Sequence, residues 1–520
     1  MEYTKGTHMK RFLHIAASLA ALVLAATGIA SAEPAKGGVI DVATIGEPPT
    51  LDPMASTADL VGIVTQHIYE TLYTFDKDWG ITPLLAADMP EISPDGLVYT
   101  IKLRTGVKFH DGSDMNSADV VASLQRWMKI ATRGKQAAEV IASVDAVDDA
   151  TVKISLKKPF APLLALLSLN NAAAIIIPSE NAGQDPLTSF VGTGPYMLKE
   201  RKPDQFIQLA RFDGYKSRDG EPNGYGGARK QYLDEIRFVP VPDPNTRVEG
   251  AVAGQFAYVD SIPVESFDKI SGGKTAPVIL KPFGWPVFVL NTKQGLNSDI
   301  RIRKAIQAAL APNDMLLAAF GSKDFFAANA ALYPEGYAWH TDAGIEPYKP
   351  DGDTEAAAAL LKEAGYDGKP LRILTSRQYE FHYKMAQVAA EYLKAAGFQV
   401  ELDVVEWATL TKNRTDPALW DVYITHSPFL PEPSLTGIMS DTSPGWWVSD
   451  RKHQVLGAFN AEADPAKRVT LFADVQKAVF DEVPAVKIGD FNALAAQAPT
   501  LKGVTPAPWP YFWNAYLEGK

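Results

Sequence analysis

Cysteine is absent from all 520 residues of this chain. Its absence excludes disulfide bonds and thiolate metal sites, and it leaves no cysteine to carry a lipid after a leader sequence. Basic residues are also fewer than acidic ones, 50 against 61, so that the formal net charge is −11. An acidic chain of this kind is a poor match for nucleic acid, and we expect none to bind.

Catalytic and metal-binding motifs are missing as well. The chain has no G-x-S-x-G and no H-E-x-x-H. Its eight histidines are scattered along the sequence, so no histidine-rich metal site is visible. The stretch SGGKT (271–275) imitates the end of a phosphate loop, but Asp268 stands where the first glycine should be. We therefore expect neither an enzyme nor a cofactor.

The composition predicts a soluble globular protein of two or three domains. Hydrophobic residues make up 46% of the chain and charged residues 21%, which suits a large buried core. Alternating apolar residues predict a strand over 38–46, and apolar residues at helical spacing predict a helix within 58–75. Further along, 354–368 reads as a helix with a glycine stop, and 383–402 as a helix, a glycine stop and a strand. Such interleaving predicts an α/β architecture with mixed sheets.

Three local patterns give sharper predictions. Ser117 is the expected N-cap of a helix with an apolar face at Val120, Leu124 and Trp127. The alternating run 97–103, followed by a turn and VKFHDG, predicts a β-hairpin. The glycine-rich stretch 217–229 predicts a surface loop.

The first 32 residues have the pattern of a leader. Lys10 and Arg11 precede an apolar run, which ends in the small residues Ala30-Ser31-Ala32. Residues 1–8 stand before a plausible start at Met9 and look like a tag or a mis-assigned start. We expect a signal peptide that is cleaved near Ala32; the alternative is a membrane anchor. No other stretch approaches the roughly 20 apolar residues of a membrane span.

Several motifs resemble those of one family. The stretch AADMPEISPDGLVYTIKLRTGVKFHDGSDMNSADVVASLQRW (86–127) resembles the signature of the peptide/nickel family of periplasmic solute-binding proteins, the receptors of ABC importers. Other family blocks have counterparts in the expected order. EPPTLDP (47–53) resembles the exit of the family's first strand, and later blocks are similar to GTGPY (192–196), LDEIRFVPVPDPNTRVEGAVAGQFAYVD (233–260) and FVLNTKQGLNSDIRIRKAIQAAL (288–310). The resemblance covers residues 38–520.

This resemblance implies a two-lobed periplasmic-binding-protein fold with an extra domain inserted in lobe I. The expected lobe I comprises 38–77, 190–283 and 495–520; the inserted domain is 78–189 and lobe II is 284–494. A protein of this family would be a periplasmic monomer that captures a peptide-like or modified amino-acid solute. It would deliver that solute to an inner-membrane ABC permease and its ATPase.

The loop DVYITHSPFLPEP (421–433) bears on which solute is bound. In the family's peptide receptors the matching segment carries an aspartate that binds the α-ammonium of the ligand. Here Phe429 falls at or beside that position, so we expect an apolar wall and weak binding of ordinary peptides. The alternative is that Phe429 belongs to the core and that Glu432 or Asp59 supplies the anchor.

Other ligand-binding candidates follow from matching positions, and for each of them a place in the core is the alternative. They are Thr57, Asp59, Phe283, Trp285, Arg377, His382, Trp407, Trp446 and Trp447. Arg377 would suit a carboxylate or phosphate on the ligand, and its alternative is a surface ion pair.

Three other functions stay open. They are a solute sensor or chaperone-like binding protein without a transporter, a nickel or heme carrier of the same fold, and a secreted hydrolase. The missing nucleophile motifs disfavour the hydrolase.

Overall fold

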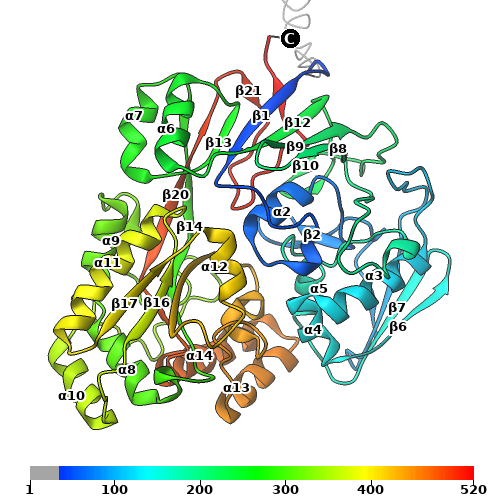
Figure 1. The fold of residues 1–520 in the computed structure, drawn as a ribbon. Helices are drawn as coiled ribbons and strands as arrows, with labels where there is room; N and C mark the ends of the chain where they lie inside the picture. The colour runs from blue at the N-terminus through cyan, green and yellow to red at the C-terminus, as the bar shows by residue number, and fades with distance from the viewer. Residues whose placement is uncertain (1–33, 520) are drawn as a thin grey trace, which may run out of the picture. The chain divides into compact units, whose positions relative to one another are not determined.

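A long mixed sheet runs through the molecule and joins strands that are far apart in the sequence (Figure 1). The computed structural model describes residues 34–519, so the expected signal peptide lies outside the described residues. The strand order is β17-β16-β18-β14-β20-β13-β1-β12-β9-β8, with β15 paired to β20 and β19 paired to β14. The bounds are β1 (Val39–Thr44), β8 (Tyr196–Lys202), β9 (Phe206–Arg211), β12 (Glu235–Pro240), β13 (Tyr258–Ile262), β14 (Ala276–Leu290), β15 (Phe326–Ala327), β16 (Leu371–Thr375), β17 (Val400–Val404), β18 (Val422–Pro428), β19 (Ala485–Lys487) and β20 (Asp490–Gln497).

Strand β14 connects the two halves of this sheet. It pairs with β20 over Ala276–Leu280 and with β18 over Gly284–Leu290. We call the half that contains β13, β1, β12, β9 and β8 lobe I, and the half that contains β18, β16 and β17 lobe II. Strand β1 lies parallel to β12 and β13, and β16 lies parallel to β17 and β18, whereas β14 is antiparallel to its neighbours. The predicted mixed α/β architecture is confirmed.

A second sheet lies inside the region predicted as an inserted domain. It is antiparallel with the order β4-β5-β7-β6, and helix α3 packs against it. Strand β5 pairs with β4 and β7, so the hairpin predicted between 97–103 and the following VKFHDG is wrong. The bounds are β4 (Glu91–Ile92), β5 (Val98–Lys102), β6 (Ile141–Asp148) and β7 (Thr151–Leu156). Three short two-stranded pairs complete the sheets: β2 (Tyr73–Phe75) with β3 (Ile81–Pro83), β10 (Pro222–Asn223) with β11 (Gly226–Gly227), and β21 (Leu501–Lys502) with β22 (Tyr516–Leu517). The predicted domain boundaries stay predictions.

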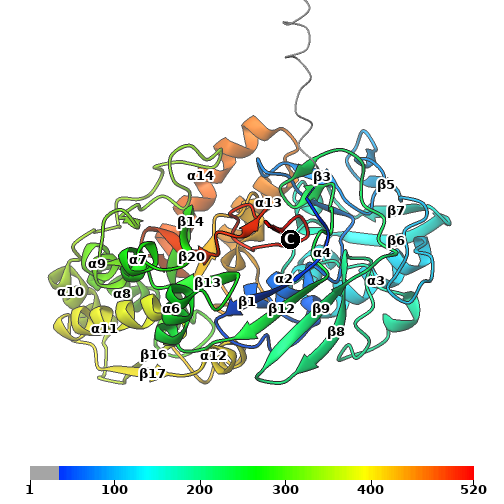
Figure 2. The same ribbon diagram turned by 90° about the horizontal axis from the view of Figure 1, so that it is seen from above.

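Helices cover the sheets of both lobes. Figures 1 and 2 show α8 to α11 gathered at one end of the molecule and α3 and α4 at the opposite end. On the side of lobe I the helices are α2 (Asp59–Thr65), α3 (Ser117–Ile130), α4 (Thr132–Ala138), α5 (Leu163–Leu166), α6 (Pro244–Ala253) and α7 (Phe267–Ser271). On the side of lobe II they are α8 (Ile300–Ala309), α9 (Pro312–Phe320), α10 (Thr354–Ala364), α11 (Glu380–Ala395), α12 (Trp407–Asn413), α13 (Asp450–Ala461) and α14 (Pro465–Glu482). Within residues 34–519 none of the helices is long and apolar enough to span a bilayer.

Two helix boundaries differ from the sequence predictions. The N-cap of α3 is Asn116, one residue before Ser117, because its side chain accepts from the backbone of Ala118 and Asp119 bonds back to the backbone of Asn116. Helix α2 ends at Thr65, although apolar spacing continues to Leu72. The apolar residues after Thr65 still enter the core, but they do so from a turn and from β2.

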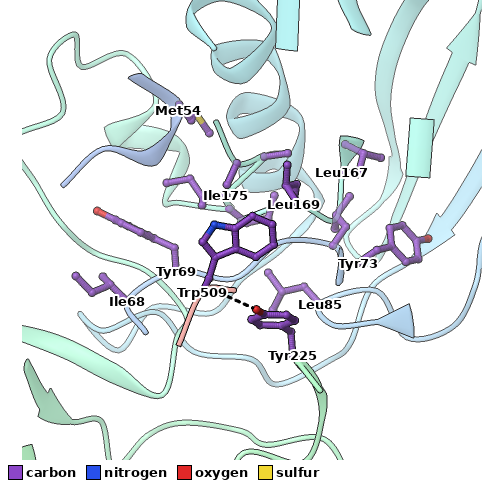
Figure 3. Close-up of a cluster of buried hydrophobic side chains, with 14 of the residues drawn as sticks. Met54, Ile68, Tyr69, Tyr73, Leu85, Leu167, Leu169, Ile175, Tyr225 and Trp509 are labelled. Carbon is purple, nitrogen blue, oxygen red and sulfur yellow. Dashed lines mark hydrogen bonds between the residues drawn. The ribbon is translucent and has the colours of Figure 1, made fainter. Parts of the chain in front are cut away.

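Trp509 lies at the centre of the lobe I core. Figure 3 shows its ring among Tyr69, Leu85 and Ile175, and the side chain is 1% exposed. Its backbone N–H donates to the hydroxyl of Tyr225 at 3.2 Å. A C-terminal residue therefore fixes elements from the first half of the chain.

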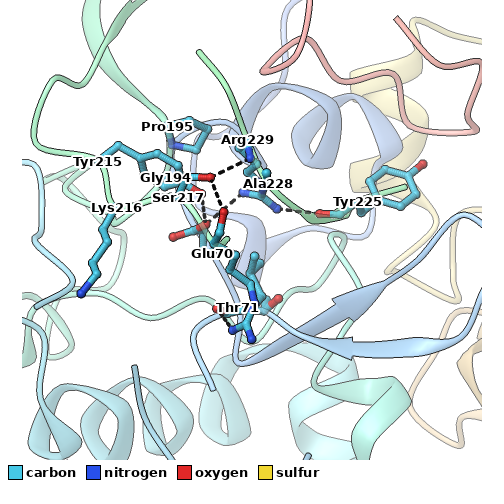
Figure 4. Close-up of polar contacts among 12 residues, drawn as sticks. Glu70, Thr71, Gly194, Pro195, Tyr215, Lys216, Ser217, Tyr225, Ala228 and Arg229 are labelled. Atoms are coloured by element: carbon cyan, nitrogen blue, oxygen red, sulfur yellow. Dashed lines mark hydrogen bonds and ion pairs between the residues drawn. The ribbon is translucent and has the colours of Figure 1, made fainter. Parts of the chain in front are cut away.

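A buried ion pair fixes the stretch 217–229, which was predicted as a surface loop. The Arg229 guanidinium lies 3.1 Å from a carboxylate oxygen of Glu70, and Tyr215 donates to the same carboxylate at 2.8 Å (Figure 4). The guanidinium also stacks 4.1 Å from the ring of Trp513. The stretch thus forms the β10–β11 pair with one end anchored in the core, because a buried charge requires its partner.

Candidate ligand-binding cleft

A cavity of about 500 Å³ lies between lobe I and lobe II. Its lobe I wall comes from the segment before and at the start of α2, and from α4; its lobe II wall comes from β14, β18, α12 and the loop after β18. The polar and aromatic side chains that line it include Thr57, Asp59, Arg133, Gln136, Asn171, Trp285, Tyr379, Trp407, Lys412, Arg414, Tyr423, Thr425, His426 and Thr436. An interior of this size fits a solute of drug-like dimensions.

Asp59 is the carboxylate of this cavity. Its Oδ1 accepts from the indole N–H of Trp509 at 2.7 Å and from the amide of Asn171 at 3.0 Å. Its Oδ2 has no hydrogen-bond partner among the residues that the structure describes. Burial raises the pKa of Asp59, although its two hydrogen bonds and the nearby guanidinium groups of Arg133 and Arg414 oppose that rise. A desolvated carboxylate with one free oxygen is suited to bind a cationic group of a solute.

Arg133 faces the same cavity from α4. It donates to the side-chain oxygen of Asn171 at 3.0 Å and to the backbone carbonyl of Leu435, which belongs to lobe II. No carboxylate lies within ion-pair distance of its guanidinium in residues 34–519. Burial lowers the pKa of Arg133 to about 10, so the group remains cationic at neutral pH.

Two further cations come from α12 and its C-terminus. Arg414 donates to the hydroxyl of Thr57 at 2.8 Å, and its guanidinium lies 5.9 Å from the ring of Tyr423. Lys412 also lines the cavity and is exposed. Neither side chain forms an ion pair within the described part of the chain. The cavity therefore presents three cations and one carboxylate.

Aromatic rings and a histidine pair form the rest of the lobe II wall. Tyr379 lies edge-on to Trp407 at 4.8 Å and to His426 at 4.7 Å. His426 Nδ1 lies 3.1 Å from His382 Nε2, so one of these imidazoles donates a hydrogen bond to the other. Burial lowers the pKa of His426 to about 3, and burial together with His426 lowers the pKa of His382, so both rings are neutral.

Comparison with known proteins identifies the family. Residues 80–445 match the model of the bacterial extracellular solute-binding proteins, family 5. The chain belongs to this family. The match spans more than half of the sequence, and the predicted resemblance is confirmed.

Curated relatives of this family 5 protein cover most of its length. It is 27% identical over 486 residues to a probable peptide ABC transporter periplasmic-binding protein of Sinorhizobium fredii, covering 89% of this chain and 90% of the relative. It is 31% identical over 393 residues to the glutathione-binding protein GsiB of Salmonella choleraesuis, covering 74% of this chain and 73% of the relative. Both relatives are thus named as binding proteins.

Solved structures of binding proteins have the same fold. The binding protein AgaA of A. tumefaciens R10, in complex with agropinic acid, matches with a TM-score of 0.82 at 25% identity, over 93% of this chain and 99% of that one. DppA of Helicobacter pylori, in complex with the peptide STSA, matches with a TM-score of 0.81 at 22% identity, over 93% and 99% of the two chains. The predicted two-lobed fold is confirmed.

The predicted site residues take different places in this family 5 structure. Thr57, Asp59, Trp285 and Trp407 line the cavity. Phe283 lines a smaller pocket of about 70 Å³, which shares Asp59, Tyr379 and His426 with the cavity. His382 lies directly behind His426, fully buried.

The remaining predicted residues lie away from the cavity. Arg377 is exposed and packs on Tyr383, to whose hydroxyl it donates at 2.7 Å. Trp446 stacks on Trp420 at 5.7 Å, and the indole N–H of Trp447 donates to Glu482 at 2.6 Å. The structure therefore gives these side chains packing partners in lobe II.

Phe429 is the predicted residue whose place matters most. It is 2% exposed, and its ring packs 5.3 Å from Tyr337 in the core of lobe II. Its neighbours Pro428 and Leu430 line the cavity, whereas Phe429 does not. Glu432 forms a buried ion pair with Arg468 at 2.8 Å and so is not free to act as an anchor. Of the alternatives open from the sequence, Asp59 is the carboxylate that the cavity contains.

Several residues of the cleft could not be identified from the sequence. Arg133 and Asn171 come from the region of the second sheet, and no motif marks them. Arg414 stands seven residues after Trp407, two helical turns along the same face of α12, and this spacing was an available signal. His426 lies within the stretch 421–433, and Tyr379 stands between the candidates Arg377 and His382, but neither residue is among the predicted ones.

Proposed function

We propose that this protein is the periplasmic substrate-binding component of an ABC importer, and that it captures a small peptide-like or amino-acid-derived solute that carries both an amine and a carboxylate. The observation that carries the proposal is the cavity between the lobes, where the free oxygen of Asp59 and the unpaired guanidinium of Arg133 face one solute-sized space. Amine and carboxylate are the groups that such a pair would bind.

The family supports the rest of this assignment. Two relatives are named as a probable peptide binder and a glutathione binder, and both peptides and glutathione carry an amine and a carboxylate. The protein would be exported after cleavage near Ala32 and would work as a monomer without catalytic activity. It would pass the solute to a membrane permease and its ATPase.

The lobes would close on the solute. Arg133 of lobe I bonds to lobe II at Leu435, and Arg414 of lobe II bonds to lobe I at Thr57, so the rim of the cavity already has contacts that a closed form requires. A solute held by both lobes stabilises the closed state through its greater affinity for that state. The permease would recognise the closed form of the protein.

Blocking the cavity tests this function. Thr411 on α12 lines the cavity, whereas Thr409 on the same helix is exposed and does not line it. Thr411→Trp should abolish binding of solutes carried through native purification and released for mass spectrometry. Thr409→Trp introduces the same side chain and should leave that binding intact.

The contraction of the protein on binding is the second measurement. Small-angle scattering should show a smaller radius of gyration for the native protein with bound solute than for the protein stripped of solute. Solute binding that survives in Thr411→Trp, or that leaves the radius unchanged, would contradict the proposed cleft.

A further inference from the structure

The charges of the cleft do not neutralise one another. Asp59 lines the cavity with Arg133, Arg414 and Lys412, yet no two of these four form an ion pair in the described chain. The smaller adjoining pocket contains Asp260 beside the guanidinium of Arg247, and also Glu380 and Glu265, the last of which pairs with Lys384. The large cavity therefore retains an excess of positive charge.

Asn171 stands between the carboxylate and one of the guanidinium groups. Its amide nitrogen donates to Asp59 at 3.0 Å, while its amide oxygen accepts from Arg133 at 3.0 Å. A neutral side chain thus satisfies one side of each charged group and keeps the two groups apart. Direct pairing of Asp59 with Arg133 would cancel both charges before a solute arrived.

Thr57 plays the corresponding part for Arg414. Its hydroxyl accepts from the guanidinium at 2.8 Å, and it stands two residues before Asp59 in the chain. Arg414 is held near Asp59 by a neutral partner, so its charge is not cancelled. Arg414 of lobe II, like Arg133 of lobe I, is therefore bonded to a neutral side chain and not to a carboxylate.

Resting on the proposed function, we propose that the solute is a net-acidic amine: a molecule with one ammonium group, bound by Asp59, and at least two anionic groups, bound by Arg133 and Arg414. Asn171 and Thr57 are positioning residues that keep these charges available. A neutral or cationic solute would leave two buried or half-buried cations without counter-charge, which is costly.

The size of the cavity sets an upper limit on such a solute. At about 30 Å³ for each water-sized unit, 500 Å³ holds on the order of 15 to 20 non-hydrogen atoms. A dipeptide of two acidic residues or an acidic amino-acid conjugate is within this limit. Long peptides exceed it.

A matched set of probes tests, by calorimetry on solute-free protein, the requirement for one ammonium group and at least two anionic groups. We call this requirement the charge rule. The probes are L-glutamyl-L-glutamate, its neutral isostere L-glutaminyl-L-glutamine, L-lysyl-L-lysine and N-acetyl-L-glutamyl-L-glutamate. We expect the acidic amine L-glutamyl-L-glutamate to bind most tightly, and added salt to weaken that binding. The neutral isostere and the N-acetylated form should each bind at least tenfold more weakly than L-glutamyl-L-glutamate.

Variants separate the role of each charge. Arg414→Gln keeps a donor for Thr57 and should weaken the acidic amine about tenfold to hundredfold, as expected for loss of a charged hydrogen bond. Arg451→Gln removes the same charge from a surface ion pair with Asp481 and should have no effect. Asn171→Ala should reduce the ratio of affinities for L-glutamyl-L-glutamate and L-glutaminyl-L-glutamine, which a purely structural role would leave unchanged.

The outcomes distinguish the two proposals. If the glutaminyl or lysyl peptide binds tightest and the protein still contracts, the charge rule is overturned and the proposed function stands. If no probe of any charge binds, the charge rule is overturned. If, in addition, native purification of the protein yields no solute, the proposed function is overturned too.

Discussion

Replacing Asp59 by asparagine should weaken the binding of amine solutes and, at the same time, stabilise the empty protein. The substitution keeps the shape of the side chain, and an amide oxygen can still accept from Trp509 and Asn171 at the positions of Oδ1. What is lost is the charge on the free oxygen. A hydrogen bond to a charged group contributes about 1.5–3 kcal/mol, so affinity for the amine should fall about tenfold to 150-fold.

The stability of the empty protein should change in the opposite direction. Burial raises the pKa of Asp59 above that of an unfolded carboxyl, so ionised Asp59 costs stability once the pH exceeds its pKa in the unfolded state. The substituted asparagine side chain has no charge to desolvate, and the thermal midpoint at pH 7.5 should rise. The gain should disappear at a pH low enough to protonate Asp59 in both the native and the unfolded protein.

Calorimetry and thermal unfolding measure the two effects separately. The affinity ratio between a free-amine probe and its N-acetylated form should approach one in Asp59→Asn. Asp88→Asn, which removes an exposed carboxylate that does not line the cleft, should leave both the ratio and the midpoint unchanged. An Asp59→Asn protein that binds the amine as tightly as the native one would refute the assignment of Asp59 as the anchor.

The structure makes further predictions about packing, titration and fluorescence. Phe429→Ala should lower the unfolding free energy by about 3–5 kcal/mol with little change in affinity, because the ring is in the core. Trp407→Ala should weaken solute binding by about 1–3 kcal/mol, because this ring lines the cavity. The reverse pattern in denaturation and calorimetry would contradict the placement of the two rings. Burial raises the pKa of Asp260 to about 6, so Asp260→Asn should raise the thermal midpoint at pH 8 by the equivalent of up to about 3 kcal/mol, and this gain should shrink below pH 6. Burial lowers the pKa of His426 to about 3, so between pH 7 and pH 4 this histidine gains a proton in the unfolded state but not in the folded state. The native protein should therefore lose stability over this pH range. In urea titrations His426→Gln should lose about 3 kcal/mol less than the native protein does. Trp407 lines the cavity, whereas Trp446 stacks on Trp420 outside it. The change in intrinsic tryptophan fluorescence on solute binding should therefore persist in Trp446→Phe and be reduced in Trp407→Phe. A fluorescence change that is lost only in Trp446→Phe would place the solute elsewhere.

The sequence alone was enough to predict the family, the α/β architecture and part of the cleft. Periodicity and glycine stops depend on local backbone preferences, so they mark strands and helices wherever they occur. The cleft residues Thr57, Asp59, Trp285 and Trp407 could be named because they stand in or next to recognisable motifs. The C-terminal end of α2 and the N-terminal end of α3 could be placed less accurately, because competing capping residues decide where a helix begins and ends.

The direction of Phe429 shows where sequence reasoning stops. Tyr423, Thr425 and Ser427 of β18 line the cavity, as do His426 and Pro428 near the end of the strand, and Phe429 continues the odd-numbered row. However, β18 ends at Pro428, and the alternation of a strand holds only while the strand continues. The chain then turns Phe429 into the core of lobe II.

The charge pattern of the cleft was decided by tertiary structure alone. Asp59 accepts from Asn171, 112 positions away in the sequence, and from Trp509, 450 positions away. Arg133 and Arg414 reach the same cavity from opposite lobes. Hydrogen bonds between distant segments leave no local pattern in a single sequence, because each residue is an ordinary polar side chain until the fold brings its partner to it.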